Sequence, residues 1–290
     1  MSPDLSKKKI LLTGGNGQLA QAFKVLFTKL GLNTAVLTRG ECDITVRDQL
    51  ANVVESLRPE IIINCAAYNL VDDAENKPEV AFKINRNGVG NLADICRERK
   101  IFLVHFSTDY VFDGFKGKPY VEEDMPAPLS VYGQSKLEGE RLVAISGADH
   151  LIFRLSWLFG NGPQNFLFKL RNWLNDRDLI QVSRDEISVP TYVVDVAGQV
   201  LNSLRRGLRG LYHLPSTGFC SRYELAQYFC SEMNIARTIE PVEQKIFSLP
   251  ARRPLFSAMS NAKLSKDLAV SIPVWQDAVS RYCRNLKGGV

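Results

Sequence analysis

The sequence has few of the residues that build metal and redox sites. Only three histidines occur among its 290 residues, and no two of them are close in sequence (His105, His150 and His213). Six cysteines are scattered without any Cys-x-x-Cys pair, at positions 42, 65, 96, 220, 230 and 283. Zinc sites and dithiol redox motifs need such close pairs. We therefore expect no metal site, and thiols that stay reduced and partly buried.

Long apolar runs and a strong charge of one sign are also lacking. No apolar stretch reaches the length of a membrane span. The run at 10–12, behind the lysines at 7–9, is too short for the core of a signal peptide. The net charge of +5 is mild and spread out, which is untypical of nucleic-acid-binding surfaces. We expect a cytoplasmic chain that binds neither membrane nor nucleic acid, while a preference for anionic small molecules stays open.

Short apolar runs alternate with segments of helical periodicity. The runs predict strands at 9–13, 33–38, 61–65, 101–107 and 151–155, with helices between them at 19–30, 47–57, 78–99 and 132–145. Further on, the pattern predicts helices at 166–174, 192–204, 222–233 and 274–286 and one strand at 210–214. Continuous apolar strands that alternate with helices indicate an α/β fold with a doubly wound parallel sheet. We expect residues 1–155, together with 190–214, to form this sheet domain, and 156–290 to form mainly a smaller, discontinuous domain over its carboxyl edge.

Glycines fill the turn between the first predicted strand and the first predicted helix. The spacing is Gly14-x-x-Gly17-x-x-Ala20. Glycines allow a sharp turn and a close approach to a pyrophosphate, and the helix N-terminus supplies free N–H groups. With a strand before it and a helix after it, the turn predicts an NAD(P)-binding Rossmann domain. The expected cofactor contacts in the turn are Thr13, Gly14, Asn16, Gly17, Gln18 and Leu19.

The end of the second predicted strand bears on the choice between NADH and NADPH. NAD-binding domains carry a carboxylate there for the ribose hydroxyls, whereas this chain has Thr38-Arg39. Arg39 can bind a 2′-phosphate, which favours NADPH, with NADH left open. Asp43 and Ile44 are expected beside the adenine. Ala66, Ala67 and Tyr68 follow the third strand and are expected along the cofactor.

A tyrosine and a lysine lie four residues apart in Val131-Tyr132-Gly133-Gln134-Ser135-Lys136. On a helix they share one face. Thr108 directly follows the fourth predicted strand, so all three side chains are expected in the crevice at the carboxyl ends of the strands. Reduction of a ketone needs a hydride for carbon and a proton for oxygen. Tyr132 can donate that proton, Lys136 can lower its pKa and hold the nicotinamide ribose, and Thr108 can bind the carbonyl oxygen.

These residues resemble the extended short-chain dehydrogenases/reductases, and within them the dTDP-4-dehydrorhamnose reductase family. The resemblance covers most of the chain. It is carried by Gly17-Gln18-Leu19, by Asn64-Cys65-Ala66-Ala67-Tyr68 with Val71-Asp72 and Ala74-Glu75, by Ser107-Thr108-Asp109-Tyr110-Val111-Phe112-Asp113-Gly114, by Val131-Tyr132-Gly133-x-x-Lys136-Leu137-x-Gly139-Glu140, and by Arg154-Leu155-Ser156-Trp157, Asn165-Phe166, Pro190-Thr191 and Arg253-Pro254.

The resemblance implies NAD(P)H-dependent reduction of the C4 ketone of a nucleotide-linked 6-deoxyhexulose, with dTDP-L-rhamnose as the family's product. It implies Thr108, Tyr132 and Lys136 as the catalytic set. Asp109, Trp157 and Arg253 are implied as substrate contacts beside Thr108 and Tyr132, with Arg253 at the diphosphate.

Departures from the family pattern leave alternatives open. Leu155 stands where the family has threonine, so the detail of the sugar pocket is open. Gln21-Ala22 replaces a glutamate that some members use in a magnesium-bridged dimer, so we expect a monomer or a weak homodimer. The related dehydratases have a glutamate after the aspartate, where this chain has Tyr110.

Two other functions remain as hypotheses: an epimerase or dehydratase that recycles its own NAD, and a non-catalytic NADP-binding regulatory subunit. The product's stereochemistry and the substrate's nucleotide stay open. Glu138 and Glu140, on the helix of Tyr132, are expected as solvated or capping charges.

Overall fold

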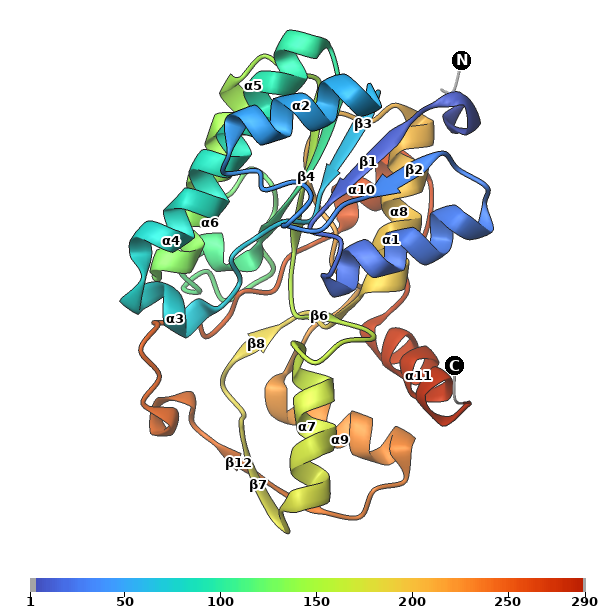
Figure 1. Ribbon diagram of the computed structural model, residues 1–290. Coiled ribbons are helices and arrows are strands. Elements are labelled where there is room, and N and C mark those ends of the chain that lie inside the picture. Colours follow the sequence, from blue (N-terminus) through green and yellow to red (C-terminus); the bar gives the residue numbers. More distant parts are fainter. Residues whose placement is uncertain (1–3, 289–290) are drawn as a thin grey trace.

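The computed structural model describes residues 4–288, and a six-stranded sheet organises most of them (Figure 1). All neighbouring strands pair in parallel, in the order β10-β5-β4-β3-β1-β2. The strands are β1 (Ile10–Thr13), β2 (Thr34–Val36), β3 (Ile61–Asn64), β4 (Phe102–Thr108), β5 (His150–Leu155) and β10 (Gly210–His213). Every strand predicted from an apolar run is therefore present, although β2 is shorter than predicted.

Helices cover both faces of the sheet. Side chains of β1 alternate between two cores: Ile10 and Leu12 belong to one apolar cluster, whereas Leu11 belongs to another. The first cluster lies under α1 (Gln18–Lys29), α8 (Val193–Arg206) and α10 (Ala262–Leu268), and the second lies under α2 (Arg47–Leu57), α5 (Val89–Arg99) and α6 (Val131–Ile145). The predicted doubly wound α/β fold is confirmed.

The helix predicted at 78–99 is continuous but not uniform. It begins as α4 (Pro78–Phe82), widens into a π-helical segment, η2 (Lys83–Gly88), and continues as α5. The short α3 (Val71–Asn76) precedes it. Buried Asn85 lies in the widened turn, where its side chain bonds the backbone N–H and C=O of Tyr68 at 2.8 and 2.9 Å. This segment fixes the loop after β3, in keeping with the frequent occurrence of π-bulges near functional sites.

A smaller group of elements lies beyond the carboxyl edge of the sheet, at the bottom of Figure 1. It contains α7 (Phe166–Asp176) and α9 (Arg222–Met233) with two pairs of short strands, β7 (Leu179–Ser183) with β12 (Thr238–Val242) and β8 (Ile187–Ser188) with β11 (Cys220–Ser221). Between the two parts run β6 (Leu158–Phe159) and β9 (Thr191–Tyr192), which pair with each other, and α11 (Trp275–Lys287). Short 3₁₀ turns complete the chain: η1 (Leu5–Lys7), η3 (Asp109–Val111) and η4 (Gln244–Phe247).

Segments after residue 155 thus contribute to both parts: α8, β10 and α10 return to the sheet. Within residues 4–288, no helix combines the length and the apolar content that a membrane crossing requires.

Candidate active site

Tyr132 lies in the first turn of α6, against the carboxyl end of β4. Ser130 caps this helix by accepting a hydrogen bond from the Gly133 amide at 3.2 Å. A side chain at Gly133 would lie 2.3 Å from the carbonyl oxygen of Tyr110, so only glycine lets α6 pack this closely against η3. The sequence thereby holds the tyrosine of the predicted pair beside the residues that follow β4.

Thr108, Tyr132 and Lys136 lie at this edge of the sheet, as the order of strands and helices predicts. The hydroxyl of Thr108 lies close enough to that of Tyr132 to lower its pKa. Lys136 is only 3% exposed, and its ammonium donates a hydrogen bond to the carbonyl oxygen of Phe106 at 2.5 Å. Burial lowers the pKa of Lys136 to about 8, while the charge of Glu140 opposes this shift.

The expected lowering of the Tyr132 pKa is not found. Burial raises this pKa to about 12, and the neighbouring Thr108 hydroxyl only partly opposes the shift. The sequence argument counted the charge of Lys136 but not the desolvation of the phenol. The protein's own groups therefore keep Tyr132 protonated at neutral pH.

The glycine turn has the form that a dinucleotide pyrophosphate needs. Gly14 has φ +68°, and a side chain there would lie 2.6 Å from the backbone nitrogen of Ala66. Gly17 caps α1 without any side-chain hydrogen bond, so no side chain takes up the N–H groups of the helix's first turn. Such N–H groups bind phosphate, so the residues present fit an NAD(P) pyrophosphate.

Other residues predicted around the cofactor divide into structural and exposed ones. The Thr13 hydroxyl donates to buried Asn64 at 2.7 Å, and Leu19 packs in the core. Gln18 joins the turn to the segment beyond β5 by donating to the carbonyl oxygen of Leu158 at 3.3 Å, and Asn16 is exposed.

The side chain of Arg39 is 73% exposed after β2 and pairs with Asp43 at 3.0 Å. Ile44 is buried, Ala66 is half-buried and Ala67 is exposed. The Tyr68 hydroxyl bonds the carboxylate of Asp73.

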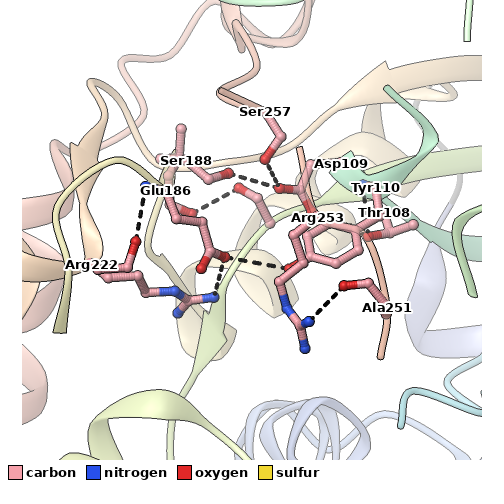
Figure 2. A network of polar contacts seen from close by, with 12 residues as sticks. Thr108, Asp109, Tyr110, Glu186, Ser188, Arg222, Ala251, Arg253 and Ser257 are labelled. Atoms are coloured by element: carbon pink, nitrogen blue, oxygen red, sulfur yellow. Dashed lines mark hydrogen bonds and ion pairs between the residues drawn. The ribbon is translucent and has the colours of Figure 1, made fainter. Parts of the chain in front are cut away.

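A cleft of about 840 Å³ opens beyond the sheet edge, between the two parts of the chain. Trp157 lines it in a left-handed conformation, with φ +39°, that is strained for a bulky residue. The guanidinium of Arg222 lies 3.6 Å from the centre of the Trp157 indole ring. Glu186 pairs with Arg222 at 3.4 Å and accepts a hydrogen bond from the Tyr110 hydroxyl at 3.4 Å (Figure 2). The sequence assigns no role to Arg222 or Glu186, because neither residue belongs to a recognised motif.

Arg253 lies on the wall of the same cleft. Its two terminal nitrogens donate to the Asp72 carboxylate at 3.0 and 2.7 Å, and one also donates to the carbonyl oxygen of Ala251 at 3.0 Å (the last contact is drawn in Figure 2). Because a guanidinium has five N–H donors, Arg253 is fixed by Asp72 and keeps donors for an anion. The cleft thus offers two arginines and an aromatic face, a combination that suits an anionic ligand with a planar base.

Two acidic side chains differ from expectation. Asp109 is only 2% exposed, and its carboxylate accepts hydrogen bonds from Ser188 at 2.8 Å, Ser257 at 2.5 Å and Thr108 at 3.2 Å. Like Thr108 and Tyr132, Asp109 does not line the cleft, and its carboxylate is occupied by protein partners, whereas the resemblance implied a substrate contact. The prediction that Glu140 is solvated is wrong.

Glu140 is 4% exposed and forms an ion pair of 2.7 Å with buried Arg154 on β5. Glu138 is more exposed and pairs with Arg86 at 2.8 Å.

The comparisons with known proteins agree with this geometry. The family model described as "RmlD substrate binding domain" matches residues 8–287. The chain is 36% identical over 284 residues to a dTDP-4-dehydrorhamnose reductase of Sinorhizobium fredii, an alignment that covers 94% of this chain and 96% of the relative. It is 37% identical over 218 residues to a dTDP-4-keto-6-deoxy-D-glucose reductase of Streptomyces niveus, covering 75% and 76% of the two chains.

A solved structure of a dTDP-4-dehydrorhamnose reductase from Bacillus anthracis, in complex with NADP, superposes with a TM-score of 0.92. It shares 34% sequence identity, and the match covers 95% of this chain and 98% of that one. Both the sequence and the fold match over nearly their full length, so the chain belongs to the dTDP-4-dehydrorhamnose reductase family.

Proposed function

We propose that this protein is an NADPH-dependent reductase of the C4 ketone of a nucleotide-linked 6-deoxy-4-hexulose. The substrate we favour is dTDP-4-dehydro-L-rhamnose, which gives dTDP-L-rhamnose, a precursor of cell-surface polysaccharide. One observation carries the proposal: Thr108, Tyr132 and Lys136 lie at the carboxyl edge of a sheet that also carries a pyrophosphate-type turn, and a cleft lined by Arg222 and Arg253 opens beyond that edge. We further propose that it acts in the cytoplasm as a monomer or a weak homodimer.

The roles of the residues follow from their surroundings. NADPH, when bound, supplies a hydride. Tyr132 gives its proton to the ketone oxygen, and its raised pKa keeps that proton in place until the oxygen becomes basic. Thr108, whose hydroxyl lies beside the phenol and acts on its pKa, positions Tyr132. Lys136 carries most of its positive charge at neutral pH, because its pKa stays near 8 despite burial.

The cleft is proposed to hold the nucleotide diphosphate. Arg253, fixed by Asp72, offers its remaining donors to the diphosphate. Trp157 offers an aromatic wall to the sugar or the base. On the cofactor side, exposed Arg39 after β2 can bind a 2′-phosphate, which supports NADPH over NADH.

Specific residues argue against the two alternative functions, a dehydratase and a non-catalytic subunit. The related dehydratases place a glutamate after the aspartate, and Tyr110 occupies that position here with its hydroxyl directed at Glu186. A non-catalytic NADP-binding subunit has no need of a buried lysine and of a tyrosine beside a threonine hydroxyl, and both are present.

The test is a coupled assay. The purified protein receives NADPH and dTDP-4-keto-6-deoxyglucose, with and without a 3,5-epimerase, and the sugar product is identified. We expect NADPH oxidation that depends on the epimerase and yields dTDP-L-rhamnose. Sugar conversion without net NADPH consumption would reject the reductase in favour of an epimerase or dehydratase. Absence of any conversion, together with a partner protein bound in equal amount, would favour the regulatory subunit.

Tyr132→Phe provides the matched check on the catalytic assignment. It removes only the phenolic oxygen, so we expect kcat to fall about 10²- to 10⁴-fold with NADPH binding retained. Tyr212→Phe, on β10 with its hydroxyl on Asp267, is the control and should keep wild-type turnover. Near-normal turnover of Tyr132→Phe would refute Tyr132 as the proton donor.

A further inference from the structure

Asp109 joins the catalytic threonine to two distant segments of the chain. Its Oδ2 accepts hydrogen bonds from Ser188 on β8 at 2.8 Å and from Ser257 in the C-terminal loop at 2.5 Å (Figure 2). Its Oδ1 lies 3.2 Å from the hydroxyl of Thr108. Asp109, Ser188 and Ser257 are each at most 2% exposed, so no bulk water competes for these bonds.

The hydroxyl of Thr108 has one proton and two lone pairs to share among three neighbours. The backbone N–H of Tyr110 donates to it at 3.2 Å and uses one lone pair. One proton and one lone pair remain, one of them for Asp109 at 3.2 Å and the other for the neighbouring hydroxyl of Tyr132. A bond between Thr108 and Tyr132 must therefore run in the direction that the bond between Thr108 and Asp109 leaves open.

The two protonation states of Asp109 give opposite directions. An ionised carboxylate can only accept, so Thr108 donates to Asp109, and the phenol of Tyr132 must then donate to Thr108. A protonated Asp109 donates from Oδ1 to Thr108 and still accepts from both serines at Oδ2. Thr108 then donates to the phenol oxygen, and the proton of Tyr132 is free for another acceptor.

We propose that Asp109 is a positioning residue for the reduction, because its proton orients the hydrogen bonds from Asp109 through Thr108 to Tyr132 so that the phenol proton faces the substrate oxygen. This inference rests on the proposed function and adds a residue that acts through Thr108 rather than on the substrate. Ser188 and Ser257 hold the carboxyl group in place from the far side.

The surroundings of Asp109 determine the pH at which it changes between its two protonation states. Burial raises the pKa of Asp109 to about 6, against the hydrogen bonds from Ser257, Ser188 and Thr108 and the positive charge of Arg222 on α9. The phenols facing it are Tyr110 on η3 and Tyr132 on α6, and burial raises the pKa of both. Glu186 faces Tyr110 and Arg222. Lys136, whose pKa lies near 8, titrates at higher pH than Asp109.

The test is the pH profile of kcat at saturating NADPH and ketosugar. For the wild type we expect two declines on the alkaline side, one through the pKa of Asp109 and one through that of Lys136, the first about tenfold per pH unit. Asp109→Asn is nearly isosteric and can donate from its amide to Thr108, but it cannot ionise. It should lose the first decline and keep the second.

Ser257→Ala moves the same decline rather than removing it. Because the Ser257 hydrogen bond stabilises the carboxylate, its loss should raise the pKa of Asp109 and shift the first decline to higher pH. Ser203→Ala removes another fully buried serine hydroxyl, one that bonds the carbonyl oxygen of Gln199 on α8, and should leave the profile unchanged. A first decline that is the same in all four proteins overturns the inference. Ser257→Ala also keeps the test valid if Asp109→Asn fails to fold.

An infrared pH titration gives a second readout that needs no substrate. The wild-type spectrum minus that of Asp109→Asn should show one carboxylic-acid band that disappears through about pH 6. If the wild type fails to oxidise NADPH at every pH, the proposed function fails, and the infrared band still reports on Asp109. If the wild type turns over but neither the band nor the profile responds, only the role of Asp109 is rejected.

Discussion

Replacing Glu140 by glutamine should test how the buried end of α6 supports Lys136. The Glu140 carboxylate holds Arg154 with three hydrogen bonds, two from the Nε atom at 3.1 and 3.2 Å and one from a terminal nitrogen at 2.7 Å. The side chains are only 6% and 3% exposed. Among the described residues, Glu140 is the one acid paired with Arg154. The other polar neighbour, His213, is held neutral because burial lowers its pKa to about 3.

Glu140→Gln leaves the Arg154 guanidinium buried without a counter-charge. Removing one partner of a buried ion pair costs about 3–5 kcal/mol, a large share of the roughly 5–15 kcal/mol that stabilises a typical domain. The same change removes the charge that most strongly supports the protonated form of Lys136. The pKa of Lys136 should therefore fall below its value of about 8. The second alkaline decline of kcat, which follows the pKa of Lys136, should then move to lower pH.

Urea unfolding followed by circular dichroism measures the stability effect, and the pH profile of kcat measures the electrostatic one. Glu138→Gln is the matched control: it lies two residues earlier on α6, its ion pair with Arg86 is partly exposed, and the expected loss is at most about 1 kcal/mol. Adding Arg154→Met to Glu140→Gln should recover most of the lost stability, but the pKa of Lys136 should stay lowered. Equal losses of unfolding free energy in Glu140→Gln and Glu138→Gln would refute this role of the buried pair. An unshifted second decline of kcat in Glu140→Gln would refute the electrostatic effect on Lys136.

Three further predictions follow from single contacts. Arg39→Ala should raise the KM for NADPH more than that for NADH, because only NADPH carries the 2′-phosphate, and equal changes would leave Arg39 an ordinary surface cation. Arg253→Lys should raise the KM for the nucleotide sugar and leave the NADPH KM unchanged, since a single ammonium cannot bond both oxygens of Asp72 and an anion with the same geometry; a rise in both constants would argue for general misfolding. Folding raises the pKa of Asp109 from 3.8 to about 6, so the stability that this group contributes is full below the unfolded value and is lost as pH rises through about 6. Asp109→Asn should therefore be stabilised relative to wild type by up to about 3 kcal/mol more at pH 8 than at low pH, and a pH-independent difference in urea midpoints would contradict this.

The sequence predicted those parts of the fold in which local pattern and tertiary structure agree. Apolar strands bounded by glycine or polar residues were recognised because burial on both faces requires continuous apolar runs. Topology alone predicts that Thr108 and Tyr132 lie close together, since parallel strands present their carboxyl ends at one edge. The pairing of β7 with β12 was not predicted. Those strands carry polar side chains such as Gln181 and Glu240, and they pair across a long stretch of sequence.

Buried polar networks were beyond prediction for a related reason. Asp109 meets Ser188 and Ser257 across sequence separations of 79 and 148 residues. Nothing in a short window distinguishes a serine that bonds a buried carboxylate from one exposed to water. Glu140 was assigned to solvent because charged residues on helices are mostly exposed, and its partner Arg154 lies in a strand whose apolar neighbours dominate the pattern.

The stripe of Tyr132, Lys136 and Glu140 on α6 shows how burial and a neighbouring charge set the protonation states with which ketone reduction starts. Burial disfavours the charged forms of Tyr132 and Lys136, so it raises the pKa of the tyrosine to about 12 and lowers that of the lysine to about 8. A tyrosine with a lowered pKa would be a better base, which an alcohol oxidation needs. Delivering a proton to a ketone oxygen needs the phenol protonated beforehand, and burial secures that state at neutral pH. Glu140 meanwhile keeps the lysine charged, so that stabilisation of phenolate is ready when the proton leaves. The local electrostatics therefore hold Tyr132 and Lys136 in the protonation states from which ketone reduction starts.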